Sequence, residues 1–317
     1  MTPAVELNQI SKAYGRVQAV RGISLSVAPG ELFGLIGPDG AGKTTLFRIL
    51  ATLLLADAGT ATLAGYDVRR DFRAIRQVVG YMPGRFSLYP DLTVAENLAF
   101  FATVFRTTIQ QNYDLIRDIY ELLLPFQNRR AGALSGGMKQ KLALCCALIH
   151  KPEVLLLDEP TTGVDAVSRQ EFWQMLAQLK AKGITIIVST PYMDEAARCE
   201  RVALLQTGHV LRVDTPSALR LAFPWPLLAV KAARMHPLVQ DLRQLAGVHS
   251  CYAFGEYAHV SLDPSRLDEA AVRHYLAGQQ HQQVEIRPSE PTIEDTFMDL
   301  LSQHAPTLAS HDTAAHH

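Results

Sequence analysis

The sequence predicts a two-part α/β protein, with a core of parallel strands, an antiparallel β layer and a helical insert, followed by a small α+β unit. Three observations predict this fold class. Uninterrupted apolar runs, typical of parallel strands buried on both faces, lie at residues 32–36, 154–157 and 184–189. Alternating segments, typical of an antiparallel layer, lie at residues 5–10, 18–27 and 59–63. After residue 226 the pattern becomes strand, helix, strand, strand, helix, strand, which is the ferredoxin-like order.

Length and composition agree with about two ordinary globular domains. The chain has 317 residues and a formal net charge of −1, so its overall charge shows no positive excess that would indicate binding to nucleic acid or anionic lipid. No apolar run approaches the roughly 18 residues that span a bilayer, and residues 1–6 lack a signal-peptide pattern. The four cysteines show no metal-ligand spacing, which fits a reducing cytoplasm. We therefore expect any membrane association to come through a partner.

The first motif follows the apolar run at residues 32–36 and opens a predicted helix over residues 44–53. It is a phosphate-loop pattern, formed by Gly37, Pro38, Asp39, Gly40, Ala41, Gly42, Lys43, Thr44 and Thr45. The glycines let backbone N–H groups turn onto the β- and γ-phosphates of a nucleotide. Lys43 supplies a positive charge, and the Thr44 hydroxyl can coordinate Mg²⁺. In this strand-loop-helix setting a nucleotide site is favoured over a glycine-rich turn that binds nothing.

A mostly helical insert is expected from about residue 84 to residue 134. Thr93 and Glu96 form a capping box that predicts a helix towards residue 105. A second helix is predicted over residues 113–124, where Pro125 stops it. The aromatic residues of the insert are expected in its core rather than at a contact surface; these are Phe100, Phe101 and Phe105.

The most informative segment ends this insert, and it consists of Leu134, Ser135, Gly136, Gly137, Met138, Lys139 and Gln140. Ser135 is placed to cap an apolar helix that runs from residue 138 towards residue 149. The two glycines leave the first backbone N–H groups of this helix uncovered, and a helix N-terminus bared in this way attracts phosphate. Taken alone, the segment is also compatible with a simple turn before a helix.

Two acidic residues end the apolar run at residues 154–157. Asp158 and Glu159 thus stand at the carboxyl end of a predicted parallel strand, where such sheets open into a site. Mg²⁺ is the natural partner of Asp158, and Glu159 is then free to orient or deprotonate the water that attacks the γ-phosphate. The alternative is that both acids only cap the turn at residues 160–163.

With these motifs in this order, residues 4–220 resemble the nucleotide-binding domain of an ATP-binding-cassette (ABC) transporter. Residues 134–140 match the family signature, residues 154–159 match its Walker B strand, and Asp165 ends its Asp-loop. The resemblance implies a head-to-tail dimer, in which each ATP is clamped between the phosphate loop of one domain and the signature of the other. Tyr14 matches the aromatic residue that stacks on adenine, whereas a lone tyrosine in a turn usually only packs.

Two positions depart from the family pattern. Gly84 stands where the family carries the glutamine that contacts Mg²⁺ and the attacking water, and Pro191 stands in place of the histidine that bonds the γ-phosphate. Glycine has no side chain for this role, and proline also lacks a backbone donor. Losing one positioned transition-state donor typically costs about 10²- to 10³-fold in rate. The alternative is that a neighbour covers the missing role, the candidates being Arg85, Thr190 and Tyr192.

The domain organisation follows from these patterns. We expect the nucleotide-binding domain at residues 1–220, the small α+β domain at residues 221–302 and a disordered tail at residues 303–317. Residues 288–297 resemble the closing segment of ABC subunits that pair with ABC-2-type export permeases. The small domain could regulate the protein or brace a dimer. The default expectation is that it is a purely structural appendage.

The resemblance implies the ATP-binding subunit of an export-type ABC transporter, with ATP and Mg²⁺ as cofactors. Its expected partners are an integral-membrane permease and a second nucleotide-binding domain, in a homodimer or heterodimer, and not nucleic acid. The expected location is the cytoplasmic side of the inner membrane, held there by the permease. Two other hypotheses remain, a soluble ABC ATPase that is not coupled to transport and a weakly hydrolysing ATP-binding scaffold.

Overall fold

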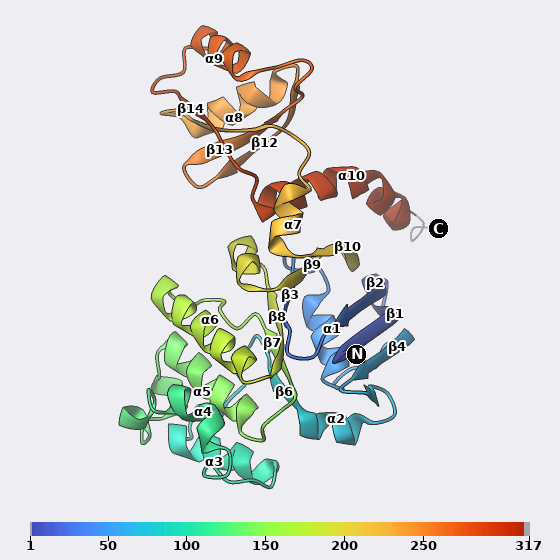
Figure 1. Ribbon diagram of the computed structural model, residues 1–317, viewed down its shortest axis with the longest axis vertical. Coiled ribbons are helices and arrows are strands. Elements are labelled where there is room, and N and C mark those ends of the chain that lie inside the picture. The colour runs from blue at the N-terminus through green and yellow to red at the C-terminus, as the bar shows by residue number, and fades with distance from the viewer. Residues whose placement is uncertain (1, 86, 314–317) are drawn as a thin grey trace. The chain divides into compact units, whose positions relative to one another are not determined.

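The computed structural model describes residues 2–85 and 87–313 (Figure 1). The chain divides into two compact units, Met1–Pro216 and Ser217–His317. Among the described residues, no helix is both long and apolar enough to cross a membrane.

The first unit begins with the antiparallel layer that the alternating segments predict. Its strands are β1 (Val5–Tyr14), β2 (Val17–Val27), β4 (Ala58–Leu63) and β5 (Tyr66–Asp67), in the order β2-β1-β4-β5. Strand β1 extends four residues beyond its predicted end. Its register shifts after Leu7, and Gln9 has a left-handed φ of 51°. This irregularity breaks the alternation on which the prediction depended.

The parallel sheet forms the second layer of this unit. It contains β3 (Leu32–Ile36), β6 (Val79–Met82), β7 (Val154–Asp158), β8 (Thr185–Thr190), β9 (Arg201–Gln206) and β10 (His209–Asp214), in the order β10-β9-β3-β8-β7-β6. All neighbouring pairs are parallel except β9 with β10, which form an antiparallel hairpin at one edge. The α/β fold class is confirmed.

A hydrophobic core joins the two layers around α1 (Lys43–Leu50). Leu46 and Phe47 of this helix are fully buried, as are Val5 of β1 and Phe33 of β3. The helix ends three residues before its predicted end, because Thr52 takes a left-handed φ of 59° that an α-helix cannot continue through. Three further helical elements flank the sheet, α2 (Phe72–Val78), α6 (Ala166–Ala181) and η3 (Met193–Arg198).

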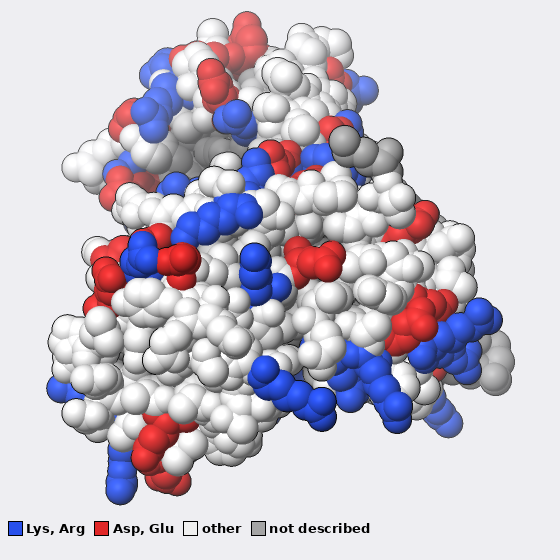
Figure 2. All heavy atoms as spheres, turned by 60° about the horizontal axis from the view of Figure 1, so that its bottom comes forward, with Lys and Arg blue, Asp and Glu red and all other residues white. Residues whose placement is uncertain are grey.

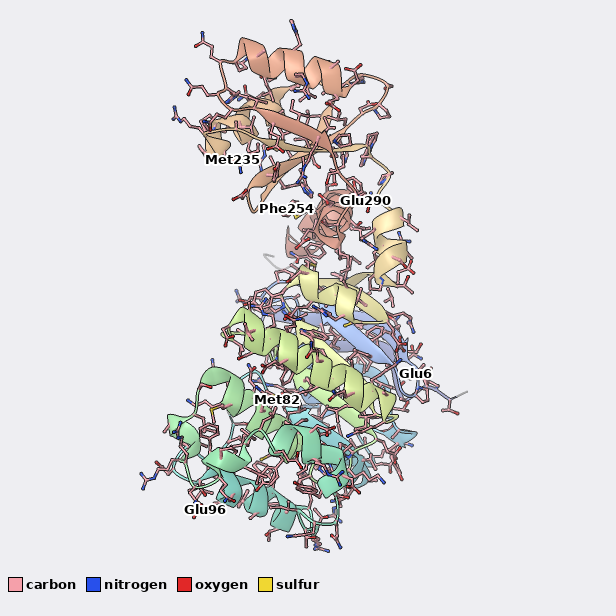
Figure 3. All side chains as sticks on the ribbon, turned by 60° about the vertical axis from the view of Figure 1, so that its left-hand side comes forward. Glu6, Met82, Glu96, Met235, Phe254 and Glu290 are labelled. Atoms are coloured by element: carbon pink, nitrogen blue, oxygen red, sulfur yellow. The ribbon has the colours of Figure 1, made fainter. Side chains whose placement is uncertain are left out.

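The helical insert contains α3 (Val94–Val104), α4 (Tyr113–Tyr120), η1 (Leu124–Phe126) and η2 (Ala131–Ala133), and α5 (Gly136–Leu148) follows it. The capping box of α3 is present, since Thr93 accepts from the Glu96 backbone and the Glu96 carboxylate accepts from the Thr93 backbone at 2.8 Å. Figure 3 labels Glu96 in this insert. Helix α4 ends at Tyr120, earlier than predicted. The chain then turns, and Pro125 lies within the separate 3₁₀ turn η1 instead of ending the helix.

The second unit contains α7 (Pro216–Leu221), β11 (Leu227–Lys231), α8 (Met235–Gln244), β12 (Val248–Phe254), β13 (Tyr257–Leu262), α9 (Glu269–Gly278), β14 (Glu285–Pro288) and α10 (Ile293–Thr313). Its antiparallel sheet has the order β12-β13-β11-β14, the ferredoxin-like arrangement that the pattern predicts. Val230, Val260 and Leu238 are fully buried in its core.

Helix α10 differs from the sequence expectation for residues 303–317. It extends to Thr313 and so includes residues 303–313, while residues 314–317 lie outside the described part of the chain. The start of α10 is fixed to the sheet of this unit, because Asp295 pairs with His259 of β13 at 3.0 Å.

Candidate functional site

The phosphate loop connects the end of β3 to the start of α1. Gly40 and Gly42 have φ values of 80° and 100°, a region that glycine enters without steric cost. A Cβ at Gly42 would lie 2.4 Å from the carbonyl oxygen of Ala19, and a Cβ at Gly37 would lie 2.3 Å from that of Leu205. The loop is therefore held against backbone on both sides, and only glycine fits these two positions.

Lys43 is the buried cation of this loop. Its side chain is 3% exposed, and Nζ donates to the carbonyl oxygens of Gly37 at 2.7 Å and of Pro38 at 3.0 Å. The same Nζ lies 3.0 Å from Oε1 of Glu159. The structure thus brings together a lysine and a carboxylate that are 116 positions apart in the sequence. Carbonyl oxygens and the Glu159 carboxylate together stabilise the charge that burial would otherwise penalise.

A second polar contact lies beside this ion pair. The Thr44 hydroxyl donates to Oδ1 of Asp158 at 3.2 Å, and the Ser189 hydroxyl donates to the same oxygen at 2.6 Å. Ser189 belongs to β8, the neighbour of β7 in the sheet. Sequence reasoning did not identify Ser189, and the only available signal was its place at the carboxyl end of a parallel strand.

Glu159 has a backbone that aims its side chain at Lys43. Its φ is 50°, in the left-handed region that costs a non-glycine residue of order 1 kcal/mol or more. Two hydrogen bonds from its backbone N–H fix this conformation, to the Ser189 hydroxyl at 2.9 Å and to the Ser189 carbonyl at 3.1 Å. Strained backbone that is held by its neighbours is common at functional sites.

Tyr14 lies at the tip of the β1–β2 hairpin. It pairs with Val17 in the register of the two strands, and its side chain is 45% exposed. Strand β2 contacts the phosphate loop, because the Ala19 carbonyl lies against Gly42. The hairpin therefore presents an exposed aromatic ring on the strand pair that borders the loop.

The signature segment lies at the start of α5. Ser135 caps this helix, and its hydroxyl accepts from the backbone N–H of Met138 at 3.4 Å. Ser135 and Gly136 are exposed, whereas Gly137 is buried. A Cβ at Gly137 would lie 2.6 Å from Oγ of Ser168. This glycine is therefore required for packing against α6, a role that the sequence did not reveal.

Asp165 links this packing to the Asp-loop. It caps α6, and its Oδ1 accepts from the backbone N–H of Ser168 at 2.9 Å. This hydrogen bond lowers the pKa of Asp165. Since Ser168 also contacts Gly137, the Asp-loop and the signature helix are held by the same residue.

The rest of the signature packs inward from the helix start. Leu134 is buried, and Lys139 and Gln140 border a cavity of about 160 Å³ that is also bordered by Gly84 and Glu159. The side-chain oxygen of Gln140 is buried without a hydrogen-bond partner among the described residues. Glu159 and the start of the signature helix thus border the same cavity, whereas no residue of the phosphate loop lines it.

Gly84 and Pro191, the two positions that depart from the family pattern, lie beside the ends of the central strands. A Cβ at Gly84 would lie 3.0 Å from the Asp158 carbonyl and 3.8 Å from Cβ of Glu159, so this backbone passes close to the end of β7. Pro191 directly follows Thr190, the last residue of β8. The structure therefore places both substituted positions next to the strand ends that carry Asp158 and Ser189.

A buried carboxylate anchors the loop that contains Pro191. Glu195 is 3% exposed and accepts hydrogen bonds from the hydroxyls of Thr190 and Thr161, at 2.5 and 3.1 Å. Arg169 lies 3.6 Å from its other oxygen, and the guanidinium carbon lies 4.4 Å from the centre of the Tyr192 ring. Thr190 and Tyr192 are therefore engaged in this network, and Arg85 is exposed.

Comparisons with known proteins decide the family. The model of the ABC transporter family matches residues 20–162. A Nod factor export ATP-binding protein I of Paraburkholderia xenovorans is 42% identical over 219 residues, which cover 68% of this chain and 72% of that protein. The protein of the same name in a Rhizobium species is 36% identical over 301 residues, covering 94% and 96%. The chain belongs to the ABC transporter ATP-binding proteins.

Other matches agree with this assignment. The probable multidrug ABC transporter ATP-binding protein YbhF of Escherichia coli is 39% identical over 303 residues, covering 94% of this chain; the chain spans only 52% of that relative. A dimeric ATP-binding cassette in a post-hydrolysis state, bound to ADP and Pi, has a TM-score of 0.60 at 26% identity and covers 67% of this chain and 98% of its own. The ATP-binding subunit of another ABC transporter has a TM-score of 0.63 at 26% identity, covering 70% and 93%.

The residues of the ABC site fit a magnesium nucleotide. The phosphate loop allows close approach of its backbone, and Lys43 provides the charge that phosphates require. Hydroxyl and carboxylate oxygens of Thr44 and Asp158 converge, which are ligands that Mg²⁺ prefers. When bound, Mg²⁺ neutralises charge on the β- and γ-phosphate oxygens. The side chains that would hold this group are therefore in place.

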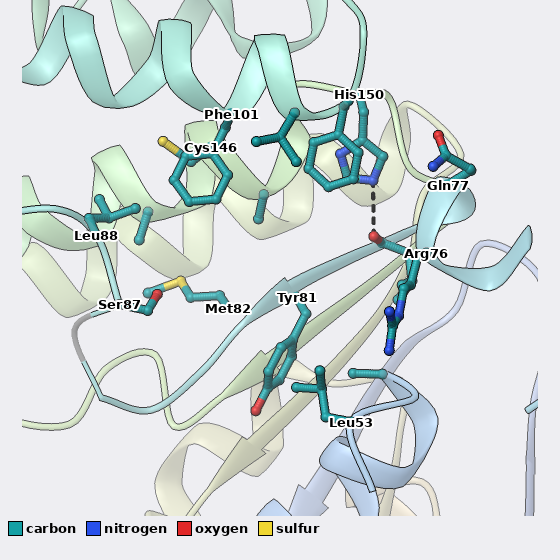
Figure 4. Close-up of a pocket in the computed structure, with 16 residues that line it drawn as sticks. Leu53, Arg76, Gln77, Tyr81, Met82, Ser87, Leu88, Phe101, Cys146 and His150 are labelled. Atoms are coloured by element: carbon teal, nitrogen blue, oxygen red, sulfur yellow. Dashed lines mark hydrogen bonds between the residues drawn. The ribbon is translucent and has the colours of Figure 1, made fainter. Parts of the chain in front are cut away.

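A groove of about 490 Å³ lies between the parallel sheet and the helical insert of the ABC unit (Figure 4). Its walls include Tyr81 of β6, Phe101 of α3, and Phe105, which stacks on His150 at 3.8 Å between ring centres. Phe100 is 39% exposed. The expectation that the three phenylalanines form a closed core was therefore wrong. Phe101 and Phe105 line the groove, while Phe100 packs edge-to-face against Tyr89 and Phe101 at the surface.

Tyr81, on one wall of the groove, lies within electrostatic reach of Asp158. Burial and the nearby Asp158 carboxylate raise the pKa of Tyr81 to about 12, so its hydroxyl stays protonated at neutral pH. At the other end, burial lowers the pKa of His150, whose Nε2 lies 2.9 Å from the Val79 carbonyl (Figure 4). A neutral His150 donates this hydrogen bond. The groove is thus lined by uncharged rings between the insert and β6.

Proposed function

We propose that this chain is the ATP-binding subunit of an export-type ABC transporter, which binds MgATP between two cassettes and drives a separate permease. The observation that carries the proposal is the pairing of two half-sites in one chain. One is the cluster of Lys43, Thr44, Asp158 and Glu159, and the other is the exposed, Ser135-capped start of α5. The first cluster explains ATP binding. The exposed N-terminus of α5 also attracts phosphate, and it is useful only to a nucleotide held by a partner. The export relatives support the transport role.

The site built on Lys43 is proposed to bind ATP well and to hydrolyse it slowly. Gly84 and Pro191 lack the side chains that act on water and the γ-phosphate in the family, and Thr190 and Tyr192 are held in the Glu195 network. One missing donor costs about 10²- to 10³-fold in rate, and two losses need not add. We expect Lys43→Ala to abolish MgATP binding in calorimetry. Brisk turnover by the purified wild-type chain would contradict slow hydrolysis.

The same proposal predicts asymmetry when the partner cassette keeps its own glutamine and histidine. Its ATP then meets Ser135 of this chain and turns over, while the site with Glu159 mainly holds ATP. In the reconstituted transporter, Ser135→Arg should abolish most ATP turnover, because the side chain fills the place where the partner's γ-phosphate docks. Glu159→Gln should cost much less. Equal losses from the two substitutions would indicate a homodimer and contradict the asymmetric model.

The permease is proposed to dock a cytoplasmic segment in the groove of Figure 4. Tyr81 connects the groove wall with the electrostatic surroundings of Asp158, so an occupant can influence the nucleotide site. Leu53→Asp places a charge at a groove residue that is 59% exposed and should reduce co-purification of the permease without changing ATP binding. Leu122→Asp is the control, since Leu122 is 53% exposed in the insert but does not line the groove. Assembly that depends only on the second unit would contradict this assignment.

A further inference from the structure

Five exposed arginines lie together on the first unit, on and around α2. Arg69 and Arg70 precede this helix, Arg73 and Arg76 belong to it, and Arg106 follows α3. Figure 2 shows basic side chains gathered on the surface that comes forward from the bottom of Figure 1, where α2 and α3 lie. We name these five residues the arginine patch. The near-neutral net charge of the whole chain conceals this local concentration.

The charge of the arginine patch is largely uncompensated. Asp67 and Asp71 are the acidic residues of the same segment, so five arginines against two aspartates leave a surplus of three positive charges. Oδ1 of Asp67 accepts from the backbone of Arg69 and Arg70, both at 2.9 Å, and Asp71 accepts from the backbone of Asp67 at 3.0 Å. The ion pairs formed within residues 2–85 and 87–313 include none of the five arginines.

Apolar side chains are interspersed among these charges. Phe72 is 39% exposed, and the guanidinium groups of Arg73 and Arg76 lie 5.7 and 5.3 Å from its ring centre. Val104 borders a cavity of about 370 Å³ that is lined in addition by Arg73, Arg76 and Arg106. Arginines mixed with exposed rings and aliphatic groups are typical of surfaces that rest on a bilayer, where charges meet phosphates and apolar groups enter the headgroup region.

We propose that the arginine patch binds the phosphate groups of anionic phospholipids at the membrane surface beside the permease. This inference rests on the proposed function, because the cavity of the patch adjoins the groove and shares Arg76, Val104 and Phe105 with it. A permease segment in the groove therefore brings the patch towards the bilayer from which that segment emerges. Guanidinium groups form paired hydrogen bonds with phosphate oxygens, which explains why arginines rather than lysines suit this place.

Vesicle binding tests the proposal with the purified full chain and no permease. Vesicles of mixed phosphatidylglycerol and phosphatidylcholine are compared with vesicles of phosphatidylcholine alone, by co-sedimentation at low and high salt. We expect binding only to the anionic vesicles, weakening as salt rises. Each arginine near such a surface contributes about fivefold in affinity, so the combined Arg69→Gln, Arg73→Gln and Arg106→Gln variant should lose about 100-fold. Arg76 is retained because it donates to Thr52.

The matched control removes the same charge elsewhere, through Arg220→Gln, Arg234→Gln and Arg266→Gln, three exposed residues of the second unit. It should keep its affinity for anionic vesicles, and both triple variants should bind ATP normally. Equal losses in the two variants, or equal binding to both kinds of vesicle, would overturn the proposal. So would a chain that ignores vesicles but whose patch variant fails to assemble with the permease, because the arginines would then recognise acidic residues of that protein. Failure of the Leu53→Asp test alone would instead concern the proposed docking groove, because Leu53 lines the groove and not the cavity of the patch.

Discussion

The contact between Gly137 and Ser168 yields a prediction whose size follows from the structure. A Cβ at position 137 would lie 2.6 Å from Oγ and 2.9 Å from Cβ of Ser168, both too close for van der Waals contact. The hydroxyl can rotate, but Cβ is fixed to the backbone of α6. Gly137→Ala must therefore displace α5 from α6, and overpacking of this kind typically costs about 1–3 kcal/mol.

The neighbouring glycine provides the matched control. A Cβ at Gly136 would meet only the Gly163 carbonyl at 3.7 Å, an ordinary contact. Both substitutions gain the same helix propensity, up to about 1 kcal/mol. The difference in unfolding free energy between Gly136→Ala and Gly137→Ala thus measures the overpacking itself. Urea unfolding in a Trp225→Phe background measures it, because the remaining tryptophan, Trp173, belongs to α6.

Ser168→Gly removes both clashing atoms and tests whether they cause the loss. Combined with Gly137→Ala, it should restore the unfolding free energy by about 1–3 kcal/mol relative to the sum of the two single changes. The hydrogen bond to Asp165 survives, because the donor is the backbone N–H of residue 168. Additive effects of the two substitutions, or equal stabilities of Gly136→Ala and Gly137→Ala, would refute the packing argument.

Two further predictions concern buried carboxylates. Glu195→Ala should lower the unfolding free energy of the first unit by about 3–5 kcal/mol, because it leaves two threonine hydroxyls and Arg169 without their shared partner. Urea unfolding measures this loss, and Glu195→Gln should show a smaller one. Burial alone would raise the pKa of Asp295, but hydrogen bonds from His259 and Thr292 hold it below its ordinary value of 3.8. A lowered folded-state pKa stabilises the protein above that value, and this contribution is lost as pH falls further. Calorimetry should therefore find Asp295→Asn less stable than wild type at neutral pH, with a difference that shrinks below pH 3.8; a constant difference would contradict this origin.

The sequence could predict those parts of the site that are contiguous in the chain. The phosphate loop, the Ser135 cap and the acidic end of β7 each combine a local motif with a local element. Ser189 and Ser168 were missed, because their roles depend on a neighbouring strand or helix that only the tertiary structure supplies. Strands β9 and β10 were also missed. Their positions, β9 within the buried sheet and β10 at its edge, are set by the tertiary structure as well.

The structure also explains how the loop containing Pro191 keeps its place without the family's histidine. The loop is held from Thr190 and Glu195, on either side of position 191, and neither contact needs a side chain at that position. Glu159 is likewise held through its own backbone by Ser189, independently of position 84. Under the proposed function, Gly84 and Pro191 lack the groups that act on the γ-phosphate, while the framework that would bind it remains. This separation is the physical basis for expecting the chain to bind MgATP firmly and to rely on a partner cassette for rapid hydrolysis.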